Sequence, residues 1–134
     1  MEVIRLNILL LDESPELLEQ MKSRLEEQGF LTQTAQSLQE ALQLIKQNTF
    51  DVVVTDATMP DNDGVALLKN KGSDIPFVML SQNVETVTAQ NLSQTSCCFL
   101  DKADLHHRLA KAVWTAFKRF KIDRQLLRDS ELAA

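Results

Sequence analysis

Polar side chains that could do chemistry end four of the apolar runs in this 134-residue sequence. They are an acidic pair, a lone acid, a hydroxyl and an acid–lysine pair, namely Asp12 and Glu13, Asp56, Ser81, and Asp101 and Lys102. Carboxylates that converge at one place repel each other, and their pKa values rise unless a cation lies among them. Mg²⁺ is the expected cation because it binds carboxylates, waters and phosphate oxygens. With a lysine and a hydroxyl nearby, these groups predict phosphoryl transfer onto a carboxylate.

The elements that carry these groups alternate between strands and helices. Short apolar runs predict five strands, at 3–11, 30–34, 50–55, 75–80 and 97–100. Helical spacing of apolar residues predicts a helix after each strand: from Pro15 to the stop at Gly29, after the cap Ser37, over 65–68 with its end at Gly72, over 84–94, and from about 104 onward. The alternation predicts right-handed crossovers and a parallel sheet with helices on both faces, a three-layer αβα arrangement. Ligands bind such sheets at the carboxyl ends of the strands, where the polar residues stand.

Taken singly, each of these residues has an ordinary structural interpretation. Asp12 and Ser81 are good helix caps, Lys102 suits a solvated surface, and residues 61–64 read as a turn before a helix. The placement of all of them at the ends of strands in one sheet is what favours a shared site.

Composition limits the classes of protein. The chain is 44% hydrophobic and 25% charged, which is ordinary for a globular domain. No apolar run approaches the roughly 20 residues of a membrane span, and no secretory signal opens the chain, so we expect a cytoplasmic protein without a membrane partner. Residues 1–104 hold 7 basic and 16 acidic side chains, which argues against nucleic acid as the main partner.

The last thirty residues are different, with 7 basic and 3 acidic side chains. We expect a folded domain over 1–120 and a helical extension or linker over 121–134. Adjacent Cys97 and Cys98 predict buried free thiols and no metal site. Consecutive His106 and His107 cannot share a helix face, so they are not expected to bind a metal or carry a phosphoryl group.

Four segments resemble the receiver domain of bacterial two-component response regulators, over about residues 4–120. They are ILLLDESPELLEQMKSRLEEQGF, FDVVVTDATMPDNDG, VMLSQ and CFLDK, in the family's order. The resemblance implies a flavodoxin-like fold, with a five-stranded parallel sheet in the order 2-1-3-4-5 and five helices. On this basis residues 1–120 are the receiver domain.

The resemblance also implies roles for the residues that match. Asp56 is the phosphoacceptor, Lys102 pairs with the phosphoryl group, and Ser81 and Phe99 are the switch residues that move when it arrives. The implied ligands of Mg²⁺ are Asp12, Glu13, Asp56 and the backbone carbonyl of Thr58. Thr58 and Gln82 flank the phosphoacceptor and are expected to control access to it.

The sequence departs from the family pattern at three of these places. Glu13 stands where most members have Asp, and one more methylene could loosen the metal site. Ala103 follows the lysine in place of the usual proline, so we expect a trans peptide bond. Gln82 is large where a small residue is usual, and we expect it to restrict access to Asp56.

The function expected from this sequence is that of a phosphorylatable switch, with no enzymatic activity beyond self-catalysed phosphotransfer and dephosphorylation. The implied partners are a sensor histidine kinase or a histidine phosphotransfer protein, an output domain or downstream protein, and a second copy bound through the fourth helix, fifth strand and fifth helix. Two alternatives stay open. One is a receiver-like scaffold that is not phosphorylated. The other is an Asp-nucleophile phosphatase of the haloacid-dehalogenase type, which is disfavoured because it needs an acid where Thr58 stands.

Overall fold

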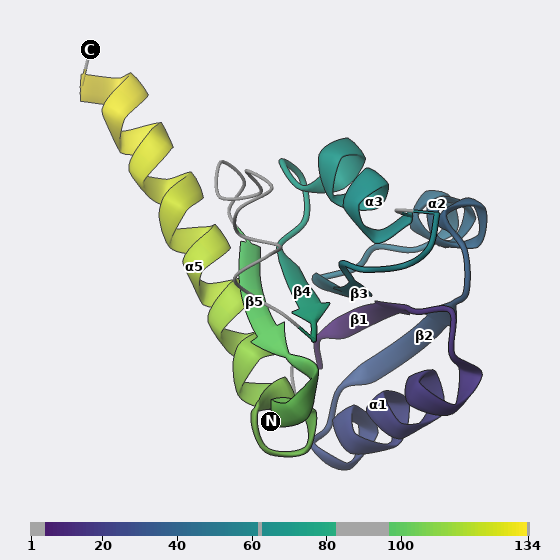
Figure 1. Cartoon of the computed structure of the whole chain (residues 1–134). Coiled ribbons are helices and arrows are strands. Elements are labelled where there is room, and N and C mark those ends of the chain that lie inside the picture. The colour runs from purple at the N-terminus through teal and green to yellow at the C-terminus, as the bar shows by residue number, and fades with distance from the viewer. Residues whose placement is uncertain (1–4, 62, 83–96, 134) are drawn as a thin grey trace.

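The computed structural model describes residues 5–61, 63–82 and 97–133, with side chains described up to residue 130. Five parallel strands form one sheet in the order β2-β1-β3-β4-β5, as the resemblance to receiver domains implies (Figure 1). The strands are β1 Asn7–Leu11, β2 Leu31–Ala35, β3 Val52–Asp56, β4 Phe77–Ser81 and β5 Cys97–Asp101.

Helices lie on both sides of this sheet (Figure 1). The described ranges contain four, α1 Pro15–Glu27, α2 Leu38–Gln47, α3 Asp63–Lys71 and α5 Leu105–Ala133, with a short 3₁₀ turn at Lys102–Asp104 before the last. The helix predicted at 84–94 lies outside the described residues. Within them, no helix is long and apolar enough to cross a bilayer.

The sheet is covered on both faces, which explains why its strands are continuously apolar and not alternating. Alternate residues of the strands point to opposite sides. Ile8, Leu10 and Val54 pack toward α1 and α5 in one core cluster. Leu9 and Val53 pack toward α2 and α3 in the other. Every residue of β3 and β4 is buried, so the positions of these strands are fixed by packing on both faces.

The helix starts follow their capping residues. Ser14 Oγ accepts the Leu17 N–H at 3.2 Å, and Pro15 occupies the first position of α1, where it has no N–H to leave unpaired. Ser37 Oγ accepts the Glu40 N–H at 3.2 Å at the start of α2. These contacts confirm two helix starts that were predicted from the sequence.

Several boundaries differ from the predicted ones. The strand predicted from residue 3 begins at Asn7. The third, fourth and fifth strands each continue one residue further, so Asp56, Ser81 and Asp101 are last residues of strands and not loop residues. The prediction of buried thiols was only partly right, because Cys97 and Cys98 form no disulfide but are half-buried on an edge strand.

The last helix continues past residue 120, the expected end of the domain. It spans 29 residues to Ala133, well past residue 120. Its first half lies beside β5, and its second half projects beyond the sheet (Figure 1).

Candidate phosphoacceptor site

The register of the sheet brings the polar strand ends to one edge. Asp56 is paired with Leu80, and Ser81 is paired with Asp101, so three neighbouring strands end within a residue of each other. Parallel strands present their carboxyl ends on the same side, and the residues that follow them share one crevice. Asp12 follows β1 and Lys102 follows β5 at this same edge.

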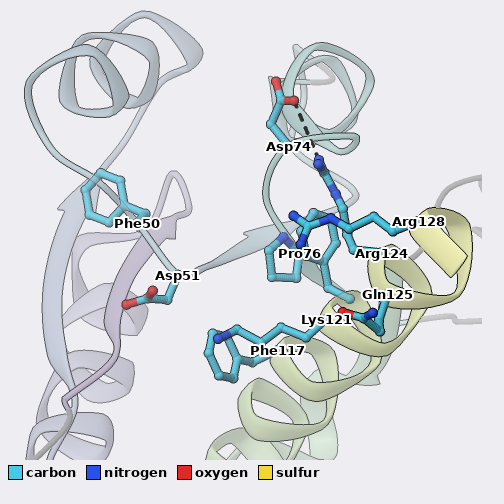
Figure 2. A pocket seen from close by; sticks show the side chains of 10 residues that line it. Phe50, Asp51, Asp74, Pro76, Phe117, Lys121, Arg124, Gln125 and Arg128 are labelled. Atoms are coloured by element: carbon cyan, nitrogen blue, oxygen red, sulfur yellow. Dashed lines mark ion pairs between the residues drawn. The ribbon is translucent and has the colours of Figure 1, made fainter. Parts of the chain in front are cut away.

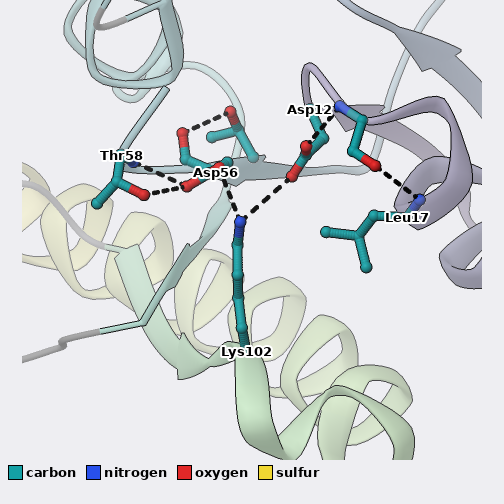
Figure 3. Close-up of polar contacts among 7 residues, drawn as sticks. Asp12, Leu17, Asp56, Thr58 and Lys102 are labelled. Atoms are coloured by element: carbon teal, nitrogen blue, oxygen red, sulfur yellow. Dashed lines mark hydrogen bonds and ion pairs between the residues drawn. The ribbon is translucent and has the colours of Figure 1, made fainter. Parts of the chain in front are cut away.

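The Lys102 side chain lies between the carboxylates of Asp12 and Asp56. Its Nζ lies 2.8 Å from Asp56 Oδ2 and 3.7 Å from Asp12 Oδ2 (Figure 3). Both acidic side chains are almost fully buried, at 2% and 5% exposure for Asp12 and Asp56, whereas the lysine is 20% exposed. The ammonium therefore neutralises buried charge that the protein interior would otherwise disfavour.

The other oxygen of Asp56 is bonded to the loop that follows it. The backbone N–H and the hydroxyl of Thr58 both donate to Asp56 Oδ1, each at 2.8 Å (Figure 3). Together with Lys102, these donors hold both carboxylate oxygens in place. Thr58 itself is exposed, so its hydroxyl stands between Asp56 and the solvent.

The Asp12 carboxylate accepts fewer hydrogen bonds than the Asp56 carboxylate does. Its Oδ1 accepts the Ser14 N–H at 2.9 Å, but its buried Oδ2 has no hydrogen-bond partner. Burial is the main cause that raises the pKa of Asp12, and repulsion from Asp56 adds to it, while the Ser14 N–H and Lys102 act in the opposite direction. A buried carboxylate oxygen without a donor is suited to a cation.

The expected metal ligands are only partly brought together. In the described ranges, no three His, Cys, Asp or Glu side chains are grouped to hold a metal ion. Asp12 and Asp56 share Lys102, but the Glu13 side chain is exposed, and its backbone carbonyl accepts a hydrogen bond from Gln36 Nε2 at 3.2 Å. Two carboxylates, one with an unsatisfied oxygen, still fit the donor set that Mg²⁺ prefers.

The predicted switch residues lie on the neighbouring strands. Ser81 is fully buried at the end of β4, and Gln82 immediately after it is exposed. Phe99 is half-buried on β5, beside Met79 in the sheet register, and packs against the α2–α3 core cluster. The peptide bond before Ala103 is trans, as expected, since the described residues contain no cis bond.

Two residues at the start of α3, just after the loop that follows Asp56, were interpreted from the sequence only as part of a turn before a helix. A Cβ on Gly64 would collide with the Asp56 carbonyl oxygen and with Thr55 Oγ1, so only glycine lets α3 start this close to the strand end. Asp63 Oδ2 accepts the Leu38 N–H at 2.9 Å and so ties the start of α3 to the start of α2. The DG pair in the sequence was the available signal for a tight backbone approach.

A separate hollow of about 480 Å³ lies at the opposite, amino edge of the sheet (Figure 2). Asp51 and Pro76, which precede β3 and β4, form one wall, and the second half of α5 forms the other. Arg124 spans it, donating to the Ser73 carbonyl and lying 3.9 Å from Asp74 (Figure 2). This hollow shares no residue with the phosphoacceptor site.

Comparison with known proteins agrees with this geometry. Residues 8–113 match the response regulator receiver domain. The chain is 29% identical over 132 residues to the two-component response regulator ARR11 of Arabidopsis thaliana, covering 96% of this chain and 25% of that protein. It is 35% identical over 105 residues to ORR22 of Oryza sativa subsp. indica, covering 74% of this chain and 15% of that protein. The chain thus spans a quarter or less of the length of these relatives.

Solved structures show the same fold. The Francisella response regulator 1452 receiver domain superposes with a TM-score of 0.73 at 30% identity, covering 86% of this chain and 98% of that one. NtrX from Brucella abortus superposes with a TM-score of 0.80 at 23% identity, covering 93% of this chain and 29% of that one. The sheet order, the Asp12–Lys102–Asp56 contacts and the match over residues 8–113 agree, and the chain belongs to the response regulator receiver domain family.

Proposed function

We propose that this domain is a switch that accepts a phosphoryl group on Asp56 from a phosphohistidine of a sensor histidine kinase or phosphotransfer protein. The observation that supports it most is the position of Lys102 Nζ, 2.8 Å from Asp56 Oδ2 and 3.7 Å from Asp12 Oδ2. An Asp56 carboxylate oxygen attacks phosphorus, a P–O bond forms, the P–N bond breaks, and the imidazole leaves with the electron pair. Lys102 then exchanges its carboxylate partner for a phosphoryl oxygen.

Asp12, Asp56 and the carbonyl of Thr58, with Glu13 after a rotamer change, would hold Mg²⁺. When bound, this ion would neutralise the charge that gathers on the transferred phosphoryl oxygens. The unsatisfied Asp12 Oδ2 and the raised pKa of Asp12 support a cation at this place. Glu13 lies on the exposed side of the acidic pair, where its side chain is unrestrained by the core.

Phosphorylation of Asp56 would add oxygen acceptors that need hydrogen-bond donors, which the resting state lacks. The new phosphoryl oxygens offer acceptors to the hydroxyl of Ser81, and movement of Ser81 leaves room for the half-buried ring of Phe99. The domain thereby shifts between two arrangements of the β4–β5 surface, which a downstream protein or output domain reads. This mechanism requires no metabolic substrate, and it would operate in the cytoplasm.

Acetyl phosphate tests the proposal without the unknown kinase. Incubation of the chain with acetyl phosphate and Mg²⁺ is expected to add the mass of one phosphoryl group, measured by intact-protein mass spectrometry. The same gain should be absent in Asp56→Asn and should fall sharply when EDTA replaces Mg²⁺. The control is Asp51→Asn, because Asp51 lies on the amino side of β3, away from the site.

A scaffold that binds partners without phosphorylation is the second candidate, and the exposed Glu13 side chain is the observation in its favour. It predicts no mass gain under any of these conditions. The haloacid-dehalogenase-type phosphatase stays disfavoured, because its general acid would have to stand at Thr58, and a threonine hydroxyl cannot do that work. The Thr58 hydroxyl instead donates a hydrogen bond to Asp56 Oδ1.

A further inference from the structure

The side of α5 that faces the protein changes in chemistry along the helix. In the first half of α5 this side is apolar, with Leu109 and Val113 buried in the core. Further along, the side chains that line the hollow at the amino edge of the sheet include Phe117, Lys121 and Arg128 (Figure 2). Positive charges gathered on a concave surface attract anions, so this hollow is a candidate site for a negatively charged ligand.

Two of the three cations in this hollow are not balanced by acidic side chains. In the part of the chain that the structure describes, Lys121 and Arg128 form no ion pair, whereas Arg124 lies 3.9 Å from Asp74. The other acid of the lining, Asp51, points away from α5, and its Oδ2 accepts a backbone N–H of β1 at 2.7 Å (Figure 2). The hollow therefore presents an excess of positive charge to a ligand.

Aromatic rings give the same hollow a flat apolar lining. Phe117 and Phe120 are both half-buried on the side of α5 that faces the hollow. Lys121 Nζ lies over the Phe117 ring, 4.6 Å from its centroid. A cation–π contact at an exposed site is weak, so an anionic partner for Lys121 would draw the ammonium away. One face of the Phe117 ring would then be open to a second flat group.

The hollow has the size of a small-molecule site. Its volume of about 480 Å³ lies within the range of roughly 300–1,000 Å³ that is typical of ligand pockets. Its lining combines cations with aromatic rings and Pro76. A ligand that uses both kinds of lining must carry an anionic group and a flat ring system on one small molecule. Nucleotides combine these two features.

We propose that this hollow binds a purine nucleotide, with its phosphates on Lys121 and Arg128 and its base on Phe117. Lys121 leaves the Phe117 ring for a phosphate oxygen, and the base stacks on the ring face that the ammonium vacates. The guanidinium of Arg128 donates two parallel hydrogen bonds to the phosphate. A purine is favoured over a pyrimidine because its two fused rings cover more of the aromatic lining.

The nucleotide site goes beyond the proposed phosphorylation and does not depend on it. The hollow lies at the amino edge of the sheet, whereas Asp56 lies at the carboxyl end of β3. A nucleotide in the hollow contacts α5 on one side and Pro76, which precedes β4, on the other. It thus bridges the gap that Arg124 already crosses to Ser73, and it ties the second half of α5 more firmly to the sheet.

The first test is isothermal titration calorimetry of the full chain with ADP and with GDP. EDTA is present, so that no Mg²⁺ draws the phosphates to the phosphoacceptor site. We expect a micromolar Kd for at least one of the two nucleotides. Inorganic diphosphate and the matching nucleoside should each bind at least about tenfold more weakly, because each lacks one half of the ligand. A Kd above about 1 mM for both nucleotides, or diphosphate binding as tightly as they do, overturns the proposal.

The second test locates the ligand by charge reversal on two sides of α5. Arg128→Glu should weaken nucleotide binding at least about tenfold. The matched control is Arg119→Glu, because Arg119 is exposed on the same helix but lies about 180° around it from Arg128 and outside the hollow. Equal losses in the two variants would mean that the nucleotide responds only to net charge, and would overturn the proposal.

The single tryptophan of the chain gives a third measurement. Trp114 lies edge-to-face with Phe117, with 6.1 Å between the ring centroids, so its fluorescence should change as the nucleotide saturates the hollow. Unchanged fluorescence at saturation places the ligand elsewhere and overturns the proposal. Circular dichroism checks that both variants are folded. Arg128→Glu should still take up a phosphoryl group from acetyl phosphate as the wild type does, so failure here is distinct from failure of the proposed function.

Discussion

Lys102 Nζ contacts Asp56 Oδ2 at 2.8 Å across 46 residues of sequence. Adjacent parallel strands β3, β4 and β5 end together, and the chain turns into the 3₁₀ segment at this point. The same ammonium lies 3.7 Å from Asp12 Oδ2, so one cation is shared by two buried carboxylates. The resting stability of the domain therefore depends on a residue of its functional site.

Lys102→Met should show this dependence. Removing the ammonium leaves Asp12 and Asp56 buried without a balancing charge, and we expect the free energy of unfolding to fall by about 1–3 kcal/mol at neutral pH. Urea denaturation measures it. Lys111→Met, at an exposed position on α5, is the control and should change the stability little. Equal stability of Lys102→Met and wild type would contradict the prediction.

Asp12→Asn should stabilise the folded domain. Because burial raises the pKa of Asp12 above its usual 3.8, the folded state binds that proton more tightly than the unfolded chain does. The favourable contribution of Asp12 is therefore full at pH values below 3.8 and is lost as the pH rises through the raised pKa. At neutral pH we expect Asp12→Asn to be more stable than wild type by about 1 kcal/mol, a gain that shrinks on acidification.

The same variant should respond less to metal. Added Mg²⁺ is expected to raise the melting temperature of the wild type and to raise that of Asp12→Asn by a smaller amount, because a ligand that binds only the folded state stabilises it. Differential scanning calorimetry with and without EDTA measures both effects. An equal Mg²⁺ response in the two proteins would place the ion elsewhere.

Thr58→Val should make Asp56 a faster nucleophile. Its hydroxyl donates to Asp56 Oδ1, and a charge-assisted hydrogen bond of this kind must be weakened before that oxygen attacks. We expect phosphorylation by acetyl phosphate to accelerate by about threefold to tenfold, corresponding to about 1 kcal/mol of barrier. Thr58→Ser keeps a hydroxyl and should react at the wild-type rate. A slower Thr58→Val would mean that the hydroxyl assists the reaction.

Gln82→Ala tests whether the exposed amide after β4 limits access to the phosphorylated Asp56. Removing it should let water approach, and we expect dephosphorylation to become about threefold faster, a small change in barrier. Loss of radiolabelled phosphate from the purified phosphoprotein gives the rate. Gln82→Met preserves the bulk and should retain the slow rate, and an unchanged rate in Gln82→Ala would exclude the access role.

Gly64→Ala should destabilise the domain, because its new methyl group would displace the backbone of Asp56. The new methyl group collides with the Asp56 carbonyl oxygen, which belongs to a strand that cannot yield, so we expect a loss of about 3 kcal/mol in the free energy of unfolding. Gly29→Ala is the matched comparison, because its methyl group meets open space and only the positive φ of 93° is strained, at a cost of about 1 kcal/mol. A smaller loss at Gly64 than at Gly29 would contradict this account.

Local signals in the sequence predicted most of the fold. Apolar runs, the caps at Ser14 and Ser37 and the break at Gly29 are encoded by neighbouring residues, and the structure confirms them. The polar ends of the strands were enough to predict that Asp12, Asp56 and Lys102 meet.

Contacts that depend on tertiary distances could not be predicted in this way. The bond from Leu38 to Asp63 joins residues 25 positions apart, and Arg124 reaches Ser73 across 51 positions. The exposure of the Glu13 side chain also depends on the path of the chain between Asp12 and the start of α1 at Pro15. The sequence left open whether residues 121–134 form a helix or a linker, because Asp123 interrupts the core-facing apolar spacing of α5.

The attachment of α5 at two places has a mechanical consequence. The helix starts directly after Lys102 and its 3₁₀ turn, and Arg124 pins it to Ser73 at the far edge of the sheet. At 29 residues it is roughly 43 Å long. Arg124 divides it unequally, so that the arm toward the phosphoacceptor, from Leu105, is the long one and the arm from Arg124 to Ala133 is the short one. If this helix tilts as one body about Ser73, a displacement at Lys102 would move the end at Ala133 by a smaller amount in the opposite direction, and so would connect the two edges of the sheet.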